Sequence, residues 1–267
     1  MTADVVERVR RSARYRDVDA AMLERLAGEE LPRSRSVDEA VKRVKRRLHQ
    51  AVGAFRGASR SGELAAAWHG DPREPDFLAA SIEVMRTHAS TRERVPHLDR
   101  FYPDIWLRTG TPRRILDLGA GLGPLALPWM DIGGATYHAA DADTRALATV
   151  DSFLDLVGQP HRVEAIDLVR EQPSDAAADV ALLLKLVTTL DRQDPRAAAR
   201  LIGSLDAAHA VVSFTTRTLG GRDRGMASTY RRRVGRLVAD VGRVMDVAEA
   251  SVANELVFVL TLDRRDG

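Results

Sequence analysis

Three glycines at alternate positions follow a short apolar run, in the stretch ILDLGAGLGP at residues 115–124. Glycine has no Cβ atom, so the backbone can turn sharply there and approach a ligand closely. The apolar run predicts a buried strand that ends at Asp117, and Pro124 suits the first turn of the helix that follows. A dinucleotide-binding loop would need glycine in place of Pro124, to complete G-x-G-x-x-G. This D-x-G-x-G-x-G loop therefore predicts a ligand cradle without a required pyrophosphate contact.

Two further aspartates stand at the ends of the next two predicted strands. An acid at Asp141 can hold ribose hydroxyls, and Asp167 is placed to meet an adenine amino group, because ligands of open α/β sheets bind at the carboxyl ends of strands. A helix N-cap is the alternative role for each acid, and it fits Asp143 better than Asp141. Together the loop and acids resemble class I S-adenosylmethionine (SAM)-dependent methyltransferases, and favour them over dinucleotide oxidoreductases.

The residue types limit the chemistry. The chain has no cysteine, which excludes a disulfide scaffold and the thiolate that a 5-methylcytosine methyltransferase needs. The fourth predicted strand runs into residues 185–190 without the Asn/Asp-Pro-Pro-Tyr loop that serves exocyclic amines. The seven histidines lack metal-site spacing, so no metal is expected. Guanine N7 has a free lone pair and no proton to remove, so the sequence is compatible with N7 methylation.

Positive charge is concentrated near the N-terminus. Residues 1–60 hold 15 Lys+Arg against 9 Asp+Glu, a net charge of +6, and the remainder has a net charge of −4. Residues 36–55 predict an amphipathic helix, opened by the capping-box pair Ser36 and Glu39. Four basic side chains fall mostly off its apolar stripe: Lys42, Lys45, Arg46 and Arg47. They favour an acidic partner such as nucleic acid, whereas a solvated face or arginine-rich codon usage would give the same pattern.

A second basic segment, SFTTRTLGGRDRGM at residues 213–226, follows the fifth predicted strand and would lie above the ligand cradle. Arginines on a glycine-rich loop can bind phosphates and stack on a displaced base. Methylation of a base in a helix usually requires flipping the base out, which gives such a loop a function. The alternative is a solvated loop with no partner.

The elements that position these residues form two regions. Residues 1–108 predict helices at 4–14, 18–27, 36–55 and 90–107. The last is opened by a second capping-box pair, Ser90 and Glu93, and loops are expected near 59–63 and 70–76. Residues 109–267 predict strands at 113–119, 135–141, 161–167, 179–185 and 208–214, with a hairpin-like edge at 243–250 and 255–263. The expected fold is α/β: a seven-stranded, Rossmann-like class I SAM-dependent methyltransferase domain (109–267) with an N-terminal all-helical extension (1–108).

Several stretches resemble the aminoglycoside-resistance 16S rRNA (guanine-N7) methyltransferases. They are RLHQAVGAF, HASTRER (88–94), PRRILDLGAGLGPLAL, LLLKLVTTLD and SFTTRTLGGRDRGM. The resemblance covers most of the chain. It implies SAM as cofactor and 7-methylguanosine in the ribosomal decoding site as product, made on the assembled 30S subunit. It also implies resistance to kanamycin- and gentamicin-type drugs.

The resemblance also implies roles for single residues. Arg94 would pair with the SAM carboxylate. The remaining cofactor contacts would be Asp117, Gly119, Gly121, Asp141, Asp167, Leu168 and Lys185. The helical extension would dock on rRNA through Lys42, Lys45, Arg46 and Arg47, with Arg217 from the later loop. The flipped guanine would be supported by Arg222, Arg224 and Met226.

The chain departs from the family's pattern at Thr215, Asp223 and Gly123, and Asp223 places an acid in the loop expected to face RNA. Three alternatives stay open: a ribose 2′-O-methyltransferase that uses Lys185, a small-molecule methyltransferase and a non-catalytic rRNA-binding assembly factor. Instead of the catalytic role in the first of these, Lys185 can have a structural one, in which it pairs with an acid such as Asp191. No apolar run could serve as a leader or cross a bilayer, so we expect a cytoplasmic protein without membrane contact. A monomer is a separate expectation that no sequence pattern determines.

Overall fold

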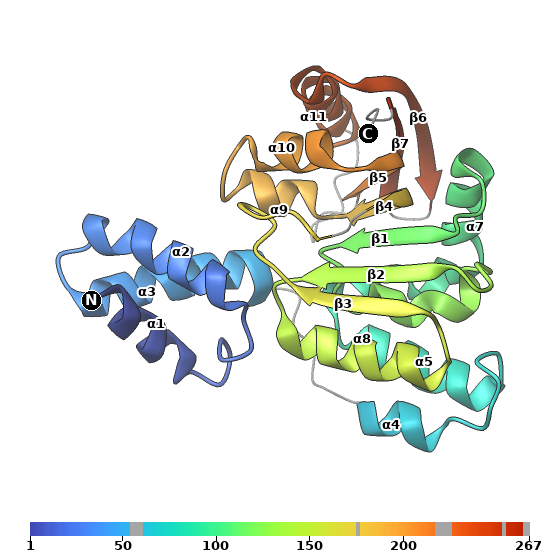
Figure 1. Ribbon diagram of the computed structural model, residues 1–267, viewed down its shortest axis with the longest axis horizontal. Helices are drawn as coiled ribbons and strands as arrows, with labels where there is room; N and C mark the ends of the chain where they lie inside the picture. The colour runs from blue at the N-terminus through green and yellow to red at the C-terminus, as the bar shows by residue number, and fades with distance from the viewer. Residues whose placement is uncertain (54–60, 175–176, 217–225, 253–254, 264–267) are drawn as a thin grey trace.

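The computed structural model describes residues 1–53, 61–174, 177–216, 226–252 and 255–263. In this part of the chain, seven strands form one sheet in the order β3-β2-β1-β4-β5-β7-β6 (Figure 1). The strands are β1 (Arg114–Leu118), β2 (Thr136–Asp141), β3 (His161–Ala165), β4 (Ala178–Leu184), β5 (Ala207–Thr215), β6 (Val244–Val252) and β7 (Glu255–Leu262). The first five pair in parallel, and β7 pairs antiparallel with both β5 and β6. The predicted α/β sheet and its terminal hairpin are therefore confirmed.

Helices cover both faces of this sheet and extend beyond it. They are α1 (Thr2–Arg10), α2 (Ala20–Glu30), α3 (Val37–Leu48), α4 (Ser61–Ala66), α5 (Pro75–Arg86), α6 (Ala89–Arg92), α7 (Leu98–Thr109), α8 (Thr144–Leu156), α9 (Val187–Asp191), α10 (Ala197–Ser204) and α11 (Met226–Val241). Buried side chains of α5, α7 and α8 pack on one face, and those of α9, α10 and α11 pack on the other. Two hydrophobic layers therefore enclose the sheet, as parallel strands require.

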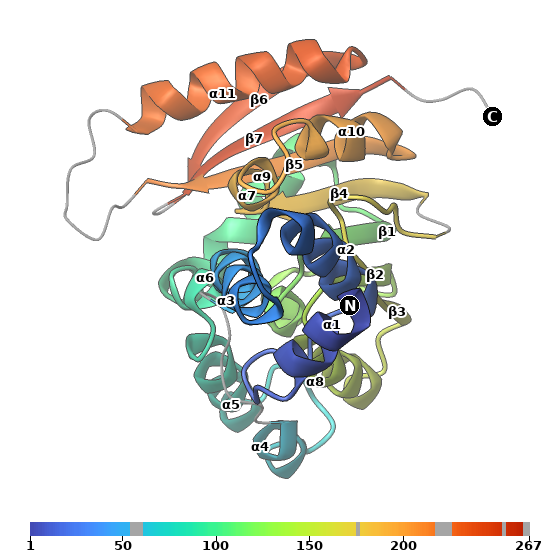
Figure 2. The ribbon, with the colours of Figure 1, turned by 90° about the vertical axis from the view of Figure 1, so that its left-hand side faces the viewer.

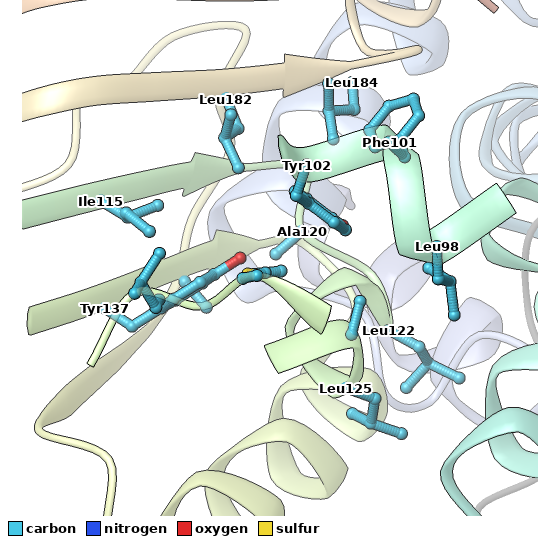
Figure 3. Close-up of a cluster of buried hydrophobic side chains, with 14 of the residues drawn as sticks. Leu98, Phe101, Tyr102, Ile115, Ala120, Leu122, Leu125, Tyr137, Leu182 and Leu184 are labelled. Atoms are coloured by element: carbon cyan, nitrogen blue, oxygen red, sulfur yellow. The ribbon is translucent and has the colours of Figure 1, made fainter. Parts of the chain in front are cut away.

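The layer beneath α7 and α8 is rich in aromatic side chains. Figure 3 shows Tyr102 of α7 and Tyr137 of β2 in the same cluster as Leu182 and Leu184 of β4. On the α5 side, Phe77 stacks on Phe153 with ring centroids 5.7 Å apart. These contacts pack α5, α7 and α8 against the sheet. They therefore also position the segment that joins α5 to α7.

The first three helices form a separate unit, with a small hydrophobic core of their own. Figures 1 and 2 show α1, α2 and α3 together, apart from α4 and α5. We call this body, residues 1–53, the N-terminal unit. Residues from α4 to α7 instead share the hydrophobic core of the sheet. The N-terminal unit and the sheet thus have separate cores, and α4 to α7 share the second core although they belong to the helical region expected over residues 1–108.

Two details of the helical region differ from expectation. The continuous helix expected over 90–107 is wrong, because a 3₁₀ turn at Val95–His97 separates α6 from α7, and Ser90 lies inside α6. Pro96 in that turn cannot donate a helical hydrogen bond. The loop expected at 59–63 is also partly wrong, since α4 begins at Ser61.

The capping pair of α3 is confirmed in part. The Ser36 Oγ accepts a bond from the Glu39 N–H at 3.2 Å, and the Glu39 carboxylate accepts from the N–H of Arg35. The stripe of Val41, Val44 and Leu48 is buried. The α-helix ends at Leu48, and a π-helical turn at His49–Gly53 continues it toward the sheet. No helix in the described ranges is both long and apolar enough to cross a bilayer.

The Phe77 stack gives a test of this packing. Replacing Phe77 by leucine (F77L) removes the ring contacts with Trp68 and Phe153. We expect the free energy of unfolding to fall by about 1–2 kcal/mol, measured by denaturant titration. L107A is the matched control, because the Leu107 side chain is 81% exposed, and its effect should stay within about 0.5 kcal/mol. Equal effects of the two changes would contradict the described packing.

Candidate functional site

A cavity lies at the carboxyl ends of β1 to β4, where ligands of open α/β sheets bind. In Figure 1 the arrowheads of β1, β2 and β3 point toward the N-terminal unit, so the cavity lies where the two bodies meet. Three separate parts of the chain line it. The N-terminal unit supplies Met22, Ala51 and Val52, and the segment before α7 supplies His88 and Ser90. The strand ends supply Gly119, Asp141, Asp167, Leu168 and Lys185.

The glycine loop after β1 turns as the sequence predicts. Gly119 and Gly121 have φ angles of +66° and +52°, which side chains rarely adopt. A Cβ atom on Gly119 would lie 2.8 Å from Leu186 Cδ1, and one on Gly121 would lie 2.8 Å from His88 Cε1. The loop is thus closely packed on both sides, and its two glycines are required by conformation and by space.

Asp141 ties this loop to the end of β2. Its carboxylate accepts hydrogen bonds from the N–H groups of Gly121 and Asp143, each at 2.8 Å. Burial raises the pKa of Asp141 to about 6, although these N–H groups favour the charged form. Asp143 caps α8 instead, accepting from the N–H groups of Arg145 and Ala146. Asp143 is therefore the N-cap, as the sequence favoured, and the ribose contact of Asp141 stays a prediction.

Asp167 and Leu168 line the same cavity beyond the end of β3. The Asp167 carboxylate is buried, and the guanidinium of Arg25 donates to both of its oxygens. Arg25 comes from α2, 142 residues away in the sequence. No motif in the sequence marks Arg25, because its partner is determined only by how the N-terminal unit packs.

Asp117 does not line the cavity; it lies buried beneath the glycine loop. Its carboxylate accepts a hydrogen bond from the Tyr137 hydroxyl at 2.8 Å. A Cβ atom on Gly123 would approach this carboxylate to 3.2 Å. Burial raises the pKa of Asp117 to about 6. In this structure Asp117 supports the loop from below, in contrast to the direct cofactor contact expected of it.

Arg94 also lies away from the cavity lining. Its buried guanidinium pairs with Glu255, at the start of β7, with Nε 2.7 Å from Oε1. The Lys185 ammonium lies 3.2 Å from the same Glu255 oxygen and donates to Glu93 Oε2 at 2.6 Å. Lys185 therefore pairs with acids, as its structural alternative requires, although not with Asp191, which pairs with Arg233 of α11. The chain thus holds two cations on one buried carboxylate beside the cavity.

His88 lines the cavity as a neutral side chain. Burial, together with the charges of Arg94 and Lys185, lowers its pKa to about 4. Its Nδ1 lies 3.0 Å from Ser90 Oγ. At neutral pH, His88 therefore adds a polar but uncharged group to the wall opposite Gly121. Among the described residues, no group of three His, Asp or Glu side chains could hold a metal ion.

Of the arginine-rich segment at residues 213–226, the structure describes residues 213–216 and Met226. Arg217, Arg222 and Arg224 lie outside the described residues. Met226 is half-buried at the first position of α11. The start of α11 is anchored, because Tyr230 stacks on Phe214 of β5 with centroids 4.6 Å apart.

The basic residues of α3 divide into two groups. Lys42 and Arg46 are exposed and Lys45 is half-buried, and none of the three forms an ion pair within the described ranges. Arg47 instead pairs with Glu29 at 2.6 Å and with Glu30 at 3.0 Å. Arg47 therefore links α3 to α2, a contact that the sequence did not predict.

Asp117 gives a pH test of the site. Its pKa of about 6 exceeds that of an unfolded aspartate, so the folded state binds the extra proton between about pH 4 and 6 and loses stability as pH rises through this window. An asparagine cannot ionise. The unfolding free energy of D117N relative to that of the unsubstituted chain should therefore rise by about 1–2 kcal/mol between pH 5 and pH 8, and its relative melting temperature should rise with it. D206N, at an exposed aspartate, should show no such trend; a D117N difference that is constant with pH would contradict the assignment.

The comparisons with known proteins agree with this arrangement. The family model described as ribosomal RNA methyltransferase (FmrO) matches residues 11–259. A 16S rRNA (guanine(1405)-N(7))-methyltransferase of Frankia casuarinae is 40% identical over 265 residues, covering 96% of this chain and 92% of that protein. A protein of the same name from Micromonospora rosea is 36% identical over 259 residues, covering 94% and 93%.

A solved structure extends the similarity to the fold. The crystal structure of the 16S rRNA methyltransferase RmtF, in complex with S-adenosyl-L-homocysteine, has a TM-score of 0.82 to this chain at 32% identity. The match covers 98% of each chain, so it includes the N-terminal unit as well as the sheet. The fold is that of a SAM-dependent methyltransferase, and the chain belongs to the FmrO family of ribosomal RNA methyltransferases.

Proposed function

We propose that this chain transfers the methyl group of SAM to N7 of guanine 1405 of 16S rRNA on the assembled 30S subunit. The relatives from Frankia and Micromonospora carry this activity in their names. The observation that carries the proposal is the cavity at the strand ends, which brings Asp141, Asp167 and the glycine loop together. We further propose that the chain acts as a cytoplasmic monomer and confers resistance to kanamycin- and gentamicin-type aminoglycosides.

The residues of the cavity fit SAM. The Asp141 carboxylate keeps acceptor capacity for ribose hydroxyls beside the two N–H groups it already binds. Asp167 and Leu168 would hold the adenine, and Gly119, which lines the cavity, would pass beneath the methionine part. Lys185, on the cavity wall, would face the carboxylate of the methionine part. Arg94 would support this end through Glu255, which it shares with Lys185.

The chain's own residues position the two reactants. SAM supplies an activated methyl group when bound, and N7 of guanine accepts it without losing a proton. Alignment of donor and acceptor is therefore the main task of the protein, and no base is needed. The neutral His88 fits this role, because it gives the cavity wall a polar group that carries no charge at neutral pH.

A ribose 2′-O-methyltransferase that uses Lys185 is not favoured. A base for a ribose hydroxyl must be free to accept a proton. The Lys185 ammonium donates to Glu93 and to the Ser90 carbonyl oxygen, and it lies 3.2 Å from Glu255. Lys185 is thus already bound to acidic and carbonyl partners, which is the structural role considered for it.

The RNA contacts are proposed on two surfaces. The first consists of Lys42, Lys45 and Arg46 on α3, which remain available for phosphates. The second is the segment that leads into α11, where Arg217, Arg222, Arg224 and Met226 would bind and support the flipped guanine. Arg47 is excluded from the first surface by its pairing with Glu29 and Glu30.

Tritiated methyl transfer from SAM to purified 30S subunits tests the proposed activity, with naked 16S rRNA alongside. Borohydride–aniline cleavage then maps any 7-methylguanosine. We expect label on 30S subunits at guanine 1405 alone. Label at another guanine would overturn the target, and no label with SAM bound would overturn the acceptor.

Asp141 tests the cofactor site. D141A removes the acceptor for the ribose and the bond to Gly121, so we expect the affinity for S-adenosyl-L-homocysteine to fall at least about tenfold by calorimetry. D155A is the matched control, because the Asp155 side chain is 77% exposed. Unchanged affinity of D141A would refute the assigned role.

The α3 surface gives a separate test. The double variant K42E/R46E reverses two charges that form no ion pair in the described chain, so binding to 30S subunits should weaken at least about tenfold and become less salt-dependent. R100E/R108E makes the same charge change on α7, far from α3 (Figure 1), and should bind nearly normally. Equal losses in both variants would show a general charge effect and contradict docking through α3.

A further inference from the structure

The N-terminal unit is joined to the strand ends at the point where the cavity acids lie. Val18 forms an antiparallel bridge with Asp143, two residues after Asp141. The N–H of Asp19 donates to the Ala142 carbonyl oxygen at 2.8 Å, and the N–H of Thr144 donates to that of Asp17 at 3.1 Å. The segment between β2 and α8 is therefore held by backbone bonds to the N-terminal unit.

Arg25 makes the second junction, at the other acid. Its Nη2 donates to Asp167 Oδ1 at 3.1 Å and to Gln193 Oε1 at 2.9 Å, and its Nε donates to Asp167 Oδ2. The side chains of Arg25 and Asp167 are only 9% and 3% exposed. A fork of two N–H groups on one carboxylate fixes its plane as well as its charge. The orientation of Asp167 is thus determined by a residue of α2.

Arg25 is itself held from behind. Glu29, one turn later on α2, contacts Arg25 at 3.4 Å and Arg47 of α3 at 2.6 Å. A continuous run of charged contacts therefore connects α3 to Asp167. Met22, one turn before Arg25, lines the cavity directly. The N-terminal unit consequently contributes to the cavity both a wall and the partner of an acid.

The remaining hydrogen-bond capacity of the Asp167 carboxylate determines which ligand group it can bind. Arg25 and the N–H of Val169 use three of about four acceptor positions on the carboxylate. The carboxylate keeps capacity for one more donor, and its residue lines the cavity. The 6-amino group of adenine is such a donor, whereas the 6-oxo group of hypoxanthine is an acceptor that a carboxylate repels.

We propose that Arg25 is a positioning residue of the cofactor site, which orients the Asp167 carboxylate so that it accepts the 6-amino group of adenine. This inference rests on the proposed role of Asp167 in binding SAM. It makes the N-terminal unit a determinant of cofactor specificity in addition to its proposed docking on rRNA. An ion pair that only joined the two bodies would affect stability but not the choice between adenine and hypoxanthine.

Calorimetry with S-adenosyl-L-homocysteine and S-inosyl-L-homocysteine tests the proposal. The unsubstituted chain should bind the adenine compound at least about tenfold more tightly. R25M should weaken binding of the adenine compound about tenfold and bring the ratio of the two affinities close to one. R25K keeps the charge but loses the two-pronged contact, so its ratio should be intermediate. R43M is the matched control, because Arg43 pairs with Glu30 on the same helices and does not contact Asp167.

The outcomes separate failure of the inference from failure of the proposed site. If D167N binds both compounds like the unsubstituted chain, the proposed adenine site is wrong. If D167N lowers the ratio and R25K and R25M leave it unchanged, only the role of Arg25 is wrong. In the D167N background, R25M should have little further effect on the ratio, because Arg25 acts through Asp167. Melting curves of each variant report on folding, and R25K remains informative should R25M not fold.

Discussion

The cavity depends on the ion pairs that surround one buried carboxylate, that of Glu255. An isolated charge is costly in the interior, and removal of one partner from a buried ion pair leaves the other uncompensated. Glu255 meets this constraint with Arg94, Lys185 and the Ser213 hydroxyl, which come from the segment before α7, the end of β4 and the end of β5. Segments far apart in sequence must therefore meet here. The position of His88 and Ser90 on the cavity wall follows from this meeting.

The charges around the cavity are arranged before any ligand arrives. Burial raises the pKa of Asp117 and of Asp141 to about 6 and lowers that of His88 to about 4. The low polarity that causes these shifts also strengthens each remaining hydrogen bond. Fixed acceptors in such a setting lose little free energy to reorganisation when they bind. A methyl transfer that needs alignment and no base suits this kind of rigid site.

The fold and part of the site follow directly from local sequence. Alternating apolar runs and helical patterns predicted the strands, and aspartates at strand ends predicted the lining at Asp141 and Asp167. The interactions that the sequence did not predict are ion pairs whose two partners are brought together only by tertiary packing. Arg94 meets Glu255 across 161 residues, Arg47 meets the acids of α2, and Arg25 meets Asp167 across 142 residues. No local pattern distinguishes such arginines from solvated ones, because helical spacing indicates a face but not what covers it.

The shared wall of the cavity has a consequence for the mobility of the N-terminal unit. This unit has a small core of its own and meets the rest of the described chain chiefly along the cavity rim. Partial opening of the molecule would therefore separate α2 from the strand ends first, and break the cavity. A ligand bound across both bodies opposes that opening by mass action, by about 2.7 kcal/mol at a hundredfold excess over its Kd. Amide hydrogens of α2 should then exchange with solvent more slowly as the concentration of the cofactor rises. The SAM concentration in the cell would therefore also determine how stably the N-terminal unit, with α3, is docked on the strand ends.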